Sequence, residues 1–550
     1  MKRLVLLSVI AALLVTARPV SVVAQRPVAP APEIRLVLMI AVDQFRADYL
    51  TRFAPEYHEG LRRLLTGGAV FTSARLEHYP TVTAIGHSTM LSGAYPADSG
   101  IVGNDWFDRA SGGTVTSVSD SGVQVLGGGA AGSAASPHRL LVTTVGDELK
   151  LAHPAAQPGS GPKVIGVSLK DRAAILPAGR GADAAYWFDV TTGAFVSSSY
   201  YFPAIPAWTT ALNQRKLADG YAGKSWTLAQ GPPTEPHVMP AAPGPALYSA
   251  IFGSPFGNDL LLAFATEALD KEQLGQRGVT DLFTVSFSSN DSVGHKYGPD
   301  SPEVRDISVK TDATIGRLLA EVDRRVGLAH TLVMFTSDHG VAPVPELLKE
   351  KRLPGGRLAG TALFDAVQQA LEERFGAGKW LLATAGSSVY LNDALMTQKK
   401  LDPIEVRGVA ADALRGAPAS HVARVYTRDQ LMKGEVSGDM VGRRVLHGFN
   451  AERSGDMEIV LEPYWIRSAT GTTHGTPYEY DAAIPLILMG PGIRAGHYAA
   501  AVALNDAAPT LASLLHIQVP SSAAGRVLTE ALQPAAPVRA PAAATAPRRP

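Results

Sequence analysis

The chain has 550 residues, of which 46% are hydrophobic and 18% are charged, a composition typical of a globular protein with an extensive buried core. Its 50 basic and 50 acidic residues balance, which argues against a general polyanion binder, so we expect no nucleic acid as a specific partner. The absence of cysteine excludes disulfides and thiolate metal ligands.

The N-terminus has the pattern of an export signal. Lys2 and Arg3 precede an apolar run from Leu4 to Ala17, which is shorter than the ~20 residues that a membrane span needs. Small residues follow and end at Ala24, so we expect a cleavable signal peptide over 1–24. The alternative is a membrane anchor. Cleavage would give a periplasmic or secreted protein without membrane contact.

A proline-rich lead-in follows over 25–33, and a low-complexity tail occupies 533–550. Between them, apolar runs of the kind expected for buried strands occur at 34–42, 282–289, 331–337 and 484–490. Segments with helical spacing occur at 312–327 and 505–517. This alternation predicts an α/β fold with a mostly parallel sheet and helices on both faces.

Two stretches interrupt the alternation. The first, 106–255, includes a stretch over 172–255 that is rich in Pro, Trp and Tyr, and the second, 345–480, contains helices and strands of its own. We expect both to be insertions, or cap subdomains, within one catalytic domain over 34–532. The balanced charge and the lack of an exposed hydrophobic helix favour a monomer.

Acids and histidines gather directly after the predicted strands, where ligands bind in open α/β sheets. The six candidates are Asp43, Asp291, His295, Asp338, His339 and the glycine-flanked His474. A single Asp after a strand is commonly a helix cap, and a single His is commonly a packing or surface residue. Five of the six follow three predicted strands, and His474 lies upstream of the run at 484–490. This coincidence favours a shared site.

Oxygen and nitrogen donors without sulfur suit Zn²⁺ or a similar first-row ion. Six ligands are too many for one tetrahedral zinc, but they suit two zincs with three protein ligands each and open positions for substrate. Three carboxylates against two dications leave about one positive charge, which favours an anionic substrate.

Two threonines, Thr81 and Thr83, precede a helical segment that ends near Gly93. Thr83 falls near the helix N-terminus, where backbone dipoles favour an anion, and a hydroxyl that contacts a metal can act as a nucleophile. The alternative is that Thr83 caps the helix, and the two roles are compatible. We expect Thr81 to be structural and His87 to be a packing residue or a support for a ligand.

Seven motifs occur in the order found in one superfamily: "AVDQFRADYL", "YPTVTAIGHSTMLSG", "GIVGNDW", "SLKDRAAILPAG", "SNDSVGHKYGP", "TSDHG" and "THGTPYEYD". From about residue 34 to 520 the chain resembles the alkaline phosphatase superfamily, and most closely its phosphate-irrepressible (PafA-type) alkaline phosphatases. The resemblance implies an alkaline-phosphatase-like three-layer α/β/α sandwich with inserted cap subdomains.

The resemblance also implies roles for individual residues. Thr83 would be the nucleophile and would contact a zinc. One of two Zn²⁺ per chain would be held by Asp291, His295 and His474, and the other by Asp43, Asp338 and His339. Asn104, Lys170 and Arg172 would contact the phosphoryl group. Without the resemblance, Lys170 and Arg172 would be interpreted as a solvated surface turn.

The leading hypothesis is a secreted di-zinc alkaline phosphatase that hydrolyses small phosphate monoesters through a phosphothreonine intermediate. The alternative is a nucleotide pyrophosphatase/phosphodiesterase, which would share the ligands and the threonine, lack the Lys–Arg pair and prefer diesters. A sulfatase is disfavoured because "TVTAI" lacks the Cys/Ser-x-Pro-x-Arg pattern. Cofactor-independent mutases use a serine and are usually cytosolic. A metal or phosphate binder without turnover is a further alternative.

Overall fold

The computed structural model describes residues 33–128, 134–157, 159–229, 235–358, 360–417 and 420–533. The expected signal peptide, and nearly all of the expected lead-in and tail, lie outside these residues. No helix in the described ranges is both long enough and apolar enough to cross a membrane.

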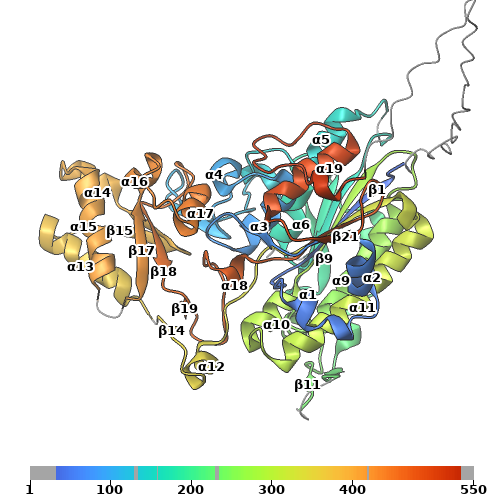
Figure 1. Ribbon diagram of the computed structural model, residues 1–550, viewed down its shortest axis with the longest axis horizontal. Helices are drawn as coiled ribbons and strands as arrows, with labels where there is room; N and C mark the ends of the chain where they lie inside the picture. Colours follow the sequence, from blue (N-terminus) through green and yellow to red (C-terminus); the bar gives the residue numbers. More distant parts are fainter. Residues whose placement is uncertain are drawn as a thin grey trace, which may run out of the picture. The chain divides into compact units, whose positions relative to one another are not determined.

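A ten-stranded sheet forms the centre of the fold (Figure 1). Its five middle strands run parallel, in the order β13 (Thr331–Thr336), β1 (Leu36–Val42), β12 (Asp281–Phe287), β7 (Val164–Ser168) and β8 (Ala184–Asp189). Beyond β13 lie β20 (Leu486–Met489), β2 (Ala69–Phe71) and β21 (Gly496–Tyr498). Beyond β8 lie β9 (Ala194–Ser198) and β6 (Val125–Leu126). The predicted mostly parallel sheet is confirmed.

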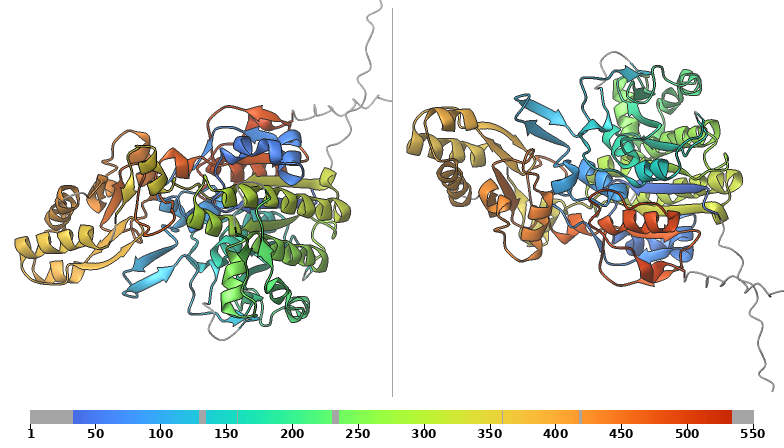
Figure 2. Two further views of the ribbon diagram at one scale, coloured as in Figure 1. Left: turned by 90° about the horizontal axis from the view of Figure 1, so that it is seen from below. Right: turned by 90° about the horizontal axis from the view of Figure 1, so that it is seen from above.

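Alternate residues of β1 enter two different hydrophobic cores, because successive side chains of a strand point to opposite faces. Leu36, Leu38 and Ile40 pack in one core with α2 (Gly60–Gly67), α9 (Pro255–Lys271) and α11 (Pro302–Arg325). Val37 and Met39 pack in the other with α3 (Thr83–Ser92), α5 (Val145–Ala152) and α19 (Ala507–Leu515). Helices therefore cover both faces, which is the predicted three-layer arrangement (Figure 2).

The stretch expected as the second insertion carries a separate antiparallel sheet, which we call the cap sheet. Its strand order is β15 (Leu381–Ala385), β16 (Ser388–Leu391), β18 (Met457–Leu461) and β17 (Val422–Thr427). Helices α13 (Ala362–Phe375) and α15 (Pro403–Gly416) pack together and share a small hydrophobic core with this sheet.

The stretch 106–255 differs from the expectation of a single insertion, because β7 and β8 lie inside the central sheet. These strands have five and six residues, and β7 contains Gly166. Runs this short do not separate from loops by periodicity alone. The run at 484–490 does form a strand, β20, but it is antiparallel to β13, a direction that apolar periodicity does not specify.

Candidate metal centre

Most candidate residues lie at the carboxyl ends of four neighbouring parallel strands, β13, β1, β12 and β7, and Lys170 is the one that follows β7. Asp338 and His339 follow β13, and Asp43 follows β1 directly. Asp291 and His295 lie on α10 (Ser289–Tyr297), which begins two residues after β12 ends. The sheet order therefore brings together side chains that are up to about 300 residues apart in sequence.

Asp43, Asp338 and His339 form the first donor set. One ligand atom from each lies within 4.8 Å of the others, and all three side chains are fully buried. Nε2 of His339 is 3.5 Å from Oδ1 of Asp43 and 3.4 Å from Oδ2 of Asp338.

Asp291, His295 and His474 form the second donor set, with the same 4.8 Å limit between ligand atoms. One helical turn of α10 puts Nε2 of His295 3.2 Å from Oδ1 of Asp291. His474 comes from the loop before α18 (Glu479–Ala482), and its Nε2 is 3.8 Å from the same oxygen. The His474 ring stacks on His339 with 3.5 Å between centroids, so the two sets adjoin.

The three histidines have the same tautomer. In each ring, Nδ1 donates to a backbone carbonyl oxygen. For His339 this is the Gly340 carbonyl, at 3.0 Å. For His295 it is the Thr472 carbonyl and for His474 the Thr81 carbonyl, each at 2.8 Å. Each Nε2 faces the carboxylates and is the nitrogen that would bind a metal when the ring is neutral. This arrangement is typical of metal-binding histidines.

The first donor set contains buried oxygens without hydrogen bonds. Oδ1 of Asp43 and Oδ2 of Asp338 accept none within the described part of the chain. Burial, with repulsion from Asp291 and Asp338, raises the pKa of Asp43 well above its usual value. Burial, with repulsion from His339 and His295, lowers the pKa of His474 well below its usual value. Carboxylate oxygens without hydrogen bonds, beside imidazole nitrogens that face them, fit a divalent cation of the Zn²⁺ type.

Thr83 is the first residue of α3, and its side chain is buried. Its hydroxyl oxygen lies 3.4 Å from Nε2 of His339, beside the first donor set. The N-cap residue is Val82, and no side chain caps this helix, so the Thr83 hydroxyl is not used as a cap. A Cβ at Gly86 would lie 2.3 Å from the Asp338 backbone oxygen, so a glycine is required for α3 to approach this close.

Thr81 and His87 lie next to these groups but bond elsewhere. The Thr81 hydroxyl donates to the Thr476 carbonyl at 2.8 Å, which ties this loop to the one that carries His474. His87 has Nε2 2.7 Å from the Ser286 hydroxyl, and Nδ1 2.9 Å from the Thr83 carbonyl and 3.2 Å from Oδ2 of Asp338. Thr81 therefore joins two loops of the candidate site, and His87 contacts both the Thr83 helix and Asp338.

Lys170 bridges the two donor sets, with Nζ 2.6 Å from Oδ2 of Asp43 and 2.6 Å from Oδ2 of Asp291. Only 9% of its side chain is exposed, so the interpretation as a solvated turn does not fit it. Burial lowers the pKa of Lys170, but the carboxylates of Asp291 and Asp43 outweigh it and raise the pKa overall. The ammonium group is therefore charged.

Asn104 and Arg172 lie at the edges of the cluster. Oδ1 of Asn104 accepts a hydrogen bond of 2.9 Å from the backbone N–H of Ala84, the residue after Thr83. Arg172 lies in the first turn of α6 (Asp171–Ala178), with Nη1 3.7 Å from Asp171, and 26% of its side chain is exposed. Asn104 is thus tied to the Thr83 helix, whereas Arg172 pairs with its neighbour.

Sequence reasoning missed Gln44, which touches both donor sets. Its side-chain amide donates to Oδ1 of Asp291 at 2.6 Å, and its backbone N–H donates to Oδ1 of Asp338 at 3.1 Å. Its φ of 62° is rare for a non-glycine residue, and a Cβ at Gly294 would lie 1.8 Å from its Oε1. The position directly after Asp43 was the only signal in the sequence.

Comparisons with known proteins agree with this geometry. A family model described as type I phosphodiesterase / nucleotide pyrophosphatase matches residues 37–477. Alkaline phosphatase PafA of Elizabethkingia meningoseptica is 34% identical over 528 residues, which cover 91% of this chain and 95% of that protein. Alkaline phosphatase PhoV of Synechococcus elongatus is 34% identical over 524 residues, which cover 91% and 93%. The crystal structure of wild-type PafA matches with a TM-score of 0.83 at 33% identity, over 92% of this chain and 100% of that one.

Proposed function

The chain belongs to the type I phosphodiesterase / nucleotide pyrophosphatase family and, within it, to the PafA-type alkaline phosphatases, and from this premise we propose that it is an exported di-zinc phosphomonoesterase. Membership of this family makes it a phosphoester hydrolase. The observation that carries the finer proposal is the buried Thr83 hydroxyl, 3.4 Å from His339, next to two donor sets of three residues each.

The proposed reaction has two displacements at phosphorus. The Thr83 oxygen loses its proton and forms a bond to phosphorus as the bond to the leaving alcohol breaks, and that alcohol takes up a proton. Water then attacks the phosphothreonine, giving inorganic phosphate and restoring the Thr83 hydroxyl. A divalent metal in each donor set would supply positive charge that favours the ionised threonine and stabilises the leaving oxygen.

The residues of the chain support a dianionic phosphoryl group. Lys170 carries its charge at the junction of the two donor sets, and Asn104 is bonded to the first turn of α3. The N-terminus of α3 begins at Thr83, so its backbone dipole favours an anion there. A monoester has one more negative charge than a diester, and Lys170, with Arg172 two residues later, would stabilise the additional charge.

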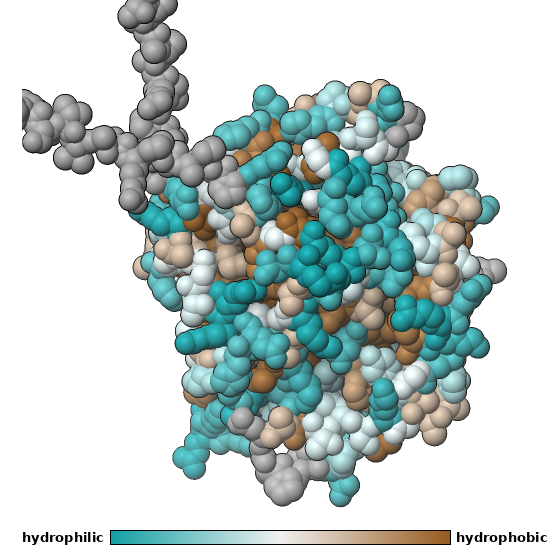
Figure 3. Space-filling model, turned by 90° about the vertical axis from the view of Figure 1, so that its right-hand side faces the viewer, coloured by the Kyte–Doolittle hydropathy of each residue, from teal (hydrophilic) through white to brown (hydrophobic). Residues whose placement is uncertain are grey.

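Zinc is proposed because the donors are nitrogen and oxygen atoms in groups of three. Export is proposed from the N-terminal sequence pattern. A monomer is proposed from the balanced charge, and the face in Figure 3 is consistent with it, since hydrophilic side chains predominate there and hydrophobic ones are scattered.

The alternative function is a nucleotide pyrophosphatase/phosphodiesterase, which the description of the matching family favours. Metal analysis of the purified protein, together with kcat/KM for p-nitrophenyl phosphate and its methyl diester, separates the two. We expect two zinc ions per chain and a higher kcat/KM for the monoester. A higher kcat/KM for the diester would favour the alternative, and two metals without turnover of either ester would favour a binding protein.

A further inference from the structure

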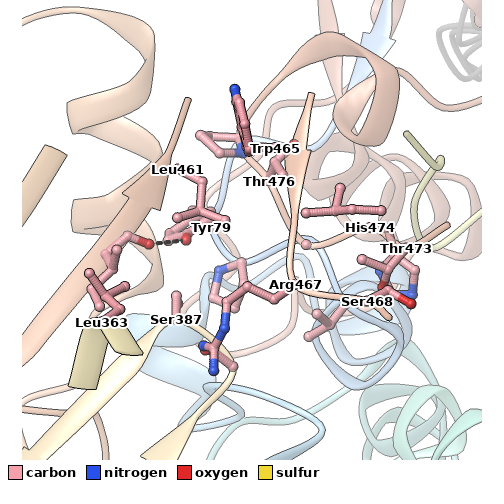
Figure 4. Close-up of a pocket in the computed structure, with 17 residues that line it drawn as sticks. Tyr79, Leu363, Ser387, Leu461, Trp465, Arg467, Ser468, Thr473, His474 and Thr476 are labelled. Atoms are coloured by element: carbon pink, nitrogen blue, oxygen red, sulfur yellow. Dashed lines mark hydrogen bonds between the residues drawn. The ribbon is translucent and has the colours of Figure 1, made fainter. Parts of the chain in front are cut away.

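A cavity of about 450 Å³ opens beside the second donor set (Figure 4). Two loops next to the candidate catalytic residues form one side of it: residues from 79–82, directly before Thr83, and residues 473–477, which include His474. Leu363 of α13 and Leu461 of β18 line it as well; both belong to residues 345–480, which we call the cap region. The cavity therefore lies between the candidate metal centre and the cap sheet.

The two donor sets have different relations to Thr83. Its hydroxyl lies beside His339 of the first set, and His474 of the second set stacks against His339. In an in-line displacement, the attacking and leaving oxygens occupy opposite sides of phosphorus. With Thr83 attacking from the first set, the leaving oxygen would lie on the side of the second set, and the rest of the alcohol would be directed toward the cavity that His474 lines.

The lining suits a planar apolar group. Aromatic or branched side chains dominate it, among them Tyr79, Val82, Leu461 and Trp465. The Tyr79 hydroxyl donates to the Ile459 carbonyl, so its polar end is satisfied within the protein. Trp465 stacks on His421 with 3.3 Å between ring centroids, which holds the indole in place. A site with held rings and a volume of this size is typical of small-molecule pockets.

One cation belongs to this lining. Nη1 of Arg467 donates to the Gly386 carbonyl at 2.9 Å, and its guanidinium lies 4.6 Å from the centroid of the Phe364 ring. Within the described ranges, Arg467 forms no ion pair. Figure 4 shows it among the side chains of the same cavity as His474. A guanidinium with free donors favours a substituent that is anionic or accepts hydrogen bonds.

We propose that this cavity is the binding site for the leaving alcohol, and that it selects phosphate monoesters whose alcohol carries an aromatic ring with an anionic or acceptor substituent. The ring packs against Leu461 and Trp465, and the substituent meets Arg467. This inference rests on the proposed monoesterase function and adds a substrate class to it.

The test uses three monoesters whose leaving oxygens have nearly equal basicity, so that binding rather than chemistry separates them. They are ethyl phosphate, 2-phenylethyl phosphate and 2-(4-carboxyphenyl)ethyl phosphate. We expect kcat/KM to rise about tenfold from the first to the second, because the ring is buried, and several-fold again for the third. Equal values for all three esters would overturn the inference, whereas no hydrolysis of any of them would overturn the proposed function itself.

Variants locate the effect in the cavity. Leu461→Trp, which fills the cavity, should bring kcat/KM for the phenylethyl ester to within about twofold of that for ethyl phosphate. Leu363→Trp, on α13 in the same cavity lining, should reduce the preference for the phenylethyl ester in the same way. It provides the test if the Leu461→Trp protein does not fold. If either folded variant keeps the preference for the aromatic ester, the inference is wrong.

Arg467→Gln should remove only the increase in kcat/KM from 2-phenylethyl phosphate to 2-(4-carboxyphenyl)ethyl phosphate, which depends on the carboxylate. Matched controls lie elsewhere in the cap region: Met432→Trp for the added ring, since Met432 is 58% exposed, and Arg443→Gln for the lost charge, since Arg443 is an exposed arginine that donates to the Gly438 carbonyl. Both controls should keep the wild-type order of the three esters. A carboxylate gain that survives Arg467→Gln would overturn the role given to this residue.

Discussion

Lys170 donates a hydrogen bond of 2.6 Å to Oδ2 of Asp43, in the buried space between two donor sets. The other oxygen of Asp43, Oδ1, is directed to His339. Asp291 is divided in the same way, with Oδ2 bonded to Lys170 and Oδ1 directed to His295. Each carboxylate thus offers one oxygen to the ammonium group and one to a histidine, so lysine and metal ligation are compatible.

Replacing the proposed nucleophile tests its role. Thr83→Ala should lower kcat for p-nitrophenyl phosphate by about a thousandfold or more, because it removes the hydroxyl on which the proposed covalent intermediate forms. Thr83→Ser keeps a hydroxyl and should retain much more activity. Thr89→Ala, which removes another buried hydroxyl from α3, is the control for packing effects. Full activity in the Thr83→Ala protein would refute the assignment.

Removing the two basic residues tests monoester selectivity. The Lys170→Ala/Arg172→Ala protein should lose about 100-fold or more in kcat/KM for the monoester and less than about tenfold for the methyl diester, because the second phosphoryl charge exists only in the monoester. Lys271→Ala/Arg324→Ala removes the same charge from the surface and serves as the control. An equal loss for both esters would show that the pair does not discriminate.

Removing the metal should lower both activity and stability. Without a cation, the buried carboxylates of Asp43 and Asp338 repel each other, so we expect a chelator to abolish turnover and to lower Tm. A ligand at 100 times its Kd stabilises by about 3 kcal/mol per site, which sets the expected size of the effect. Calorimetry before and after re-addition of Zn²⁺ measures it. Unchanged Tm and activity after verified metal removal would contradict a metal centre.

Glu458 should make the cap sheet less stable at alkaline pH. Burial raises its pKa to about 7, despite hydrogen bonds donated by Ser387 and Ser388 that lower it. Since the pKa in the folded state exceeds the unfolded value, the protonated group contributes stability that is complete below about pH 4.5 and is lost as the pH rises through about 7.

Between pH 5.5 and 9, this loss amounts to about 2 kcal/mol in the free energy of unfolding. Glu458→Gln imitates the protonated group, so its urea midpoint should fall less over this range than that of the wild type. The surface variant Glu373→Gln, on α13, removes an exposed carboxylate that bonds, among the described residues, only to Gln369 and should keep the wild-type pH dependence. Identical pH dependence in Glu458→Gln and the wild type would contradict the prediction.

The sequence specified much of the sheet and of the donor sets, because one physical rule links them. Buried parallel strands end at a common edge, so the acids after 34–42, 282–289 and 331–337 were expected to meet, and the structure brings Asp43, Asp291 and Asp338 to that edge. His474, which comes from a loop, was included only because glycines flank it and because the family motif contains it.

Other features depend on tertiary contacts that no local pattern contains. The role of Gln44 requires a backbone with φ of 62° and a glycine at position 294, on another element. The membership of β7 and β8 in the central sheet is set by their neighbours rather than by their short sequences. The cavity beside His474 requires the loop before Thr83 and the cap region to face each other across almost 400 residues of sequence.

Anomalous diffraction at the zinc edge, from crystals of the zinc-loaded protein, tests the central claim most directly. We predict two peaks about 4 Å apart, one among Asp43, Asp338 and His339 and the other among Asp291, His295 and His474. A single peak, or peaks bound by other side chains, would contradict the two-metal account.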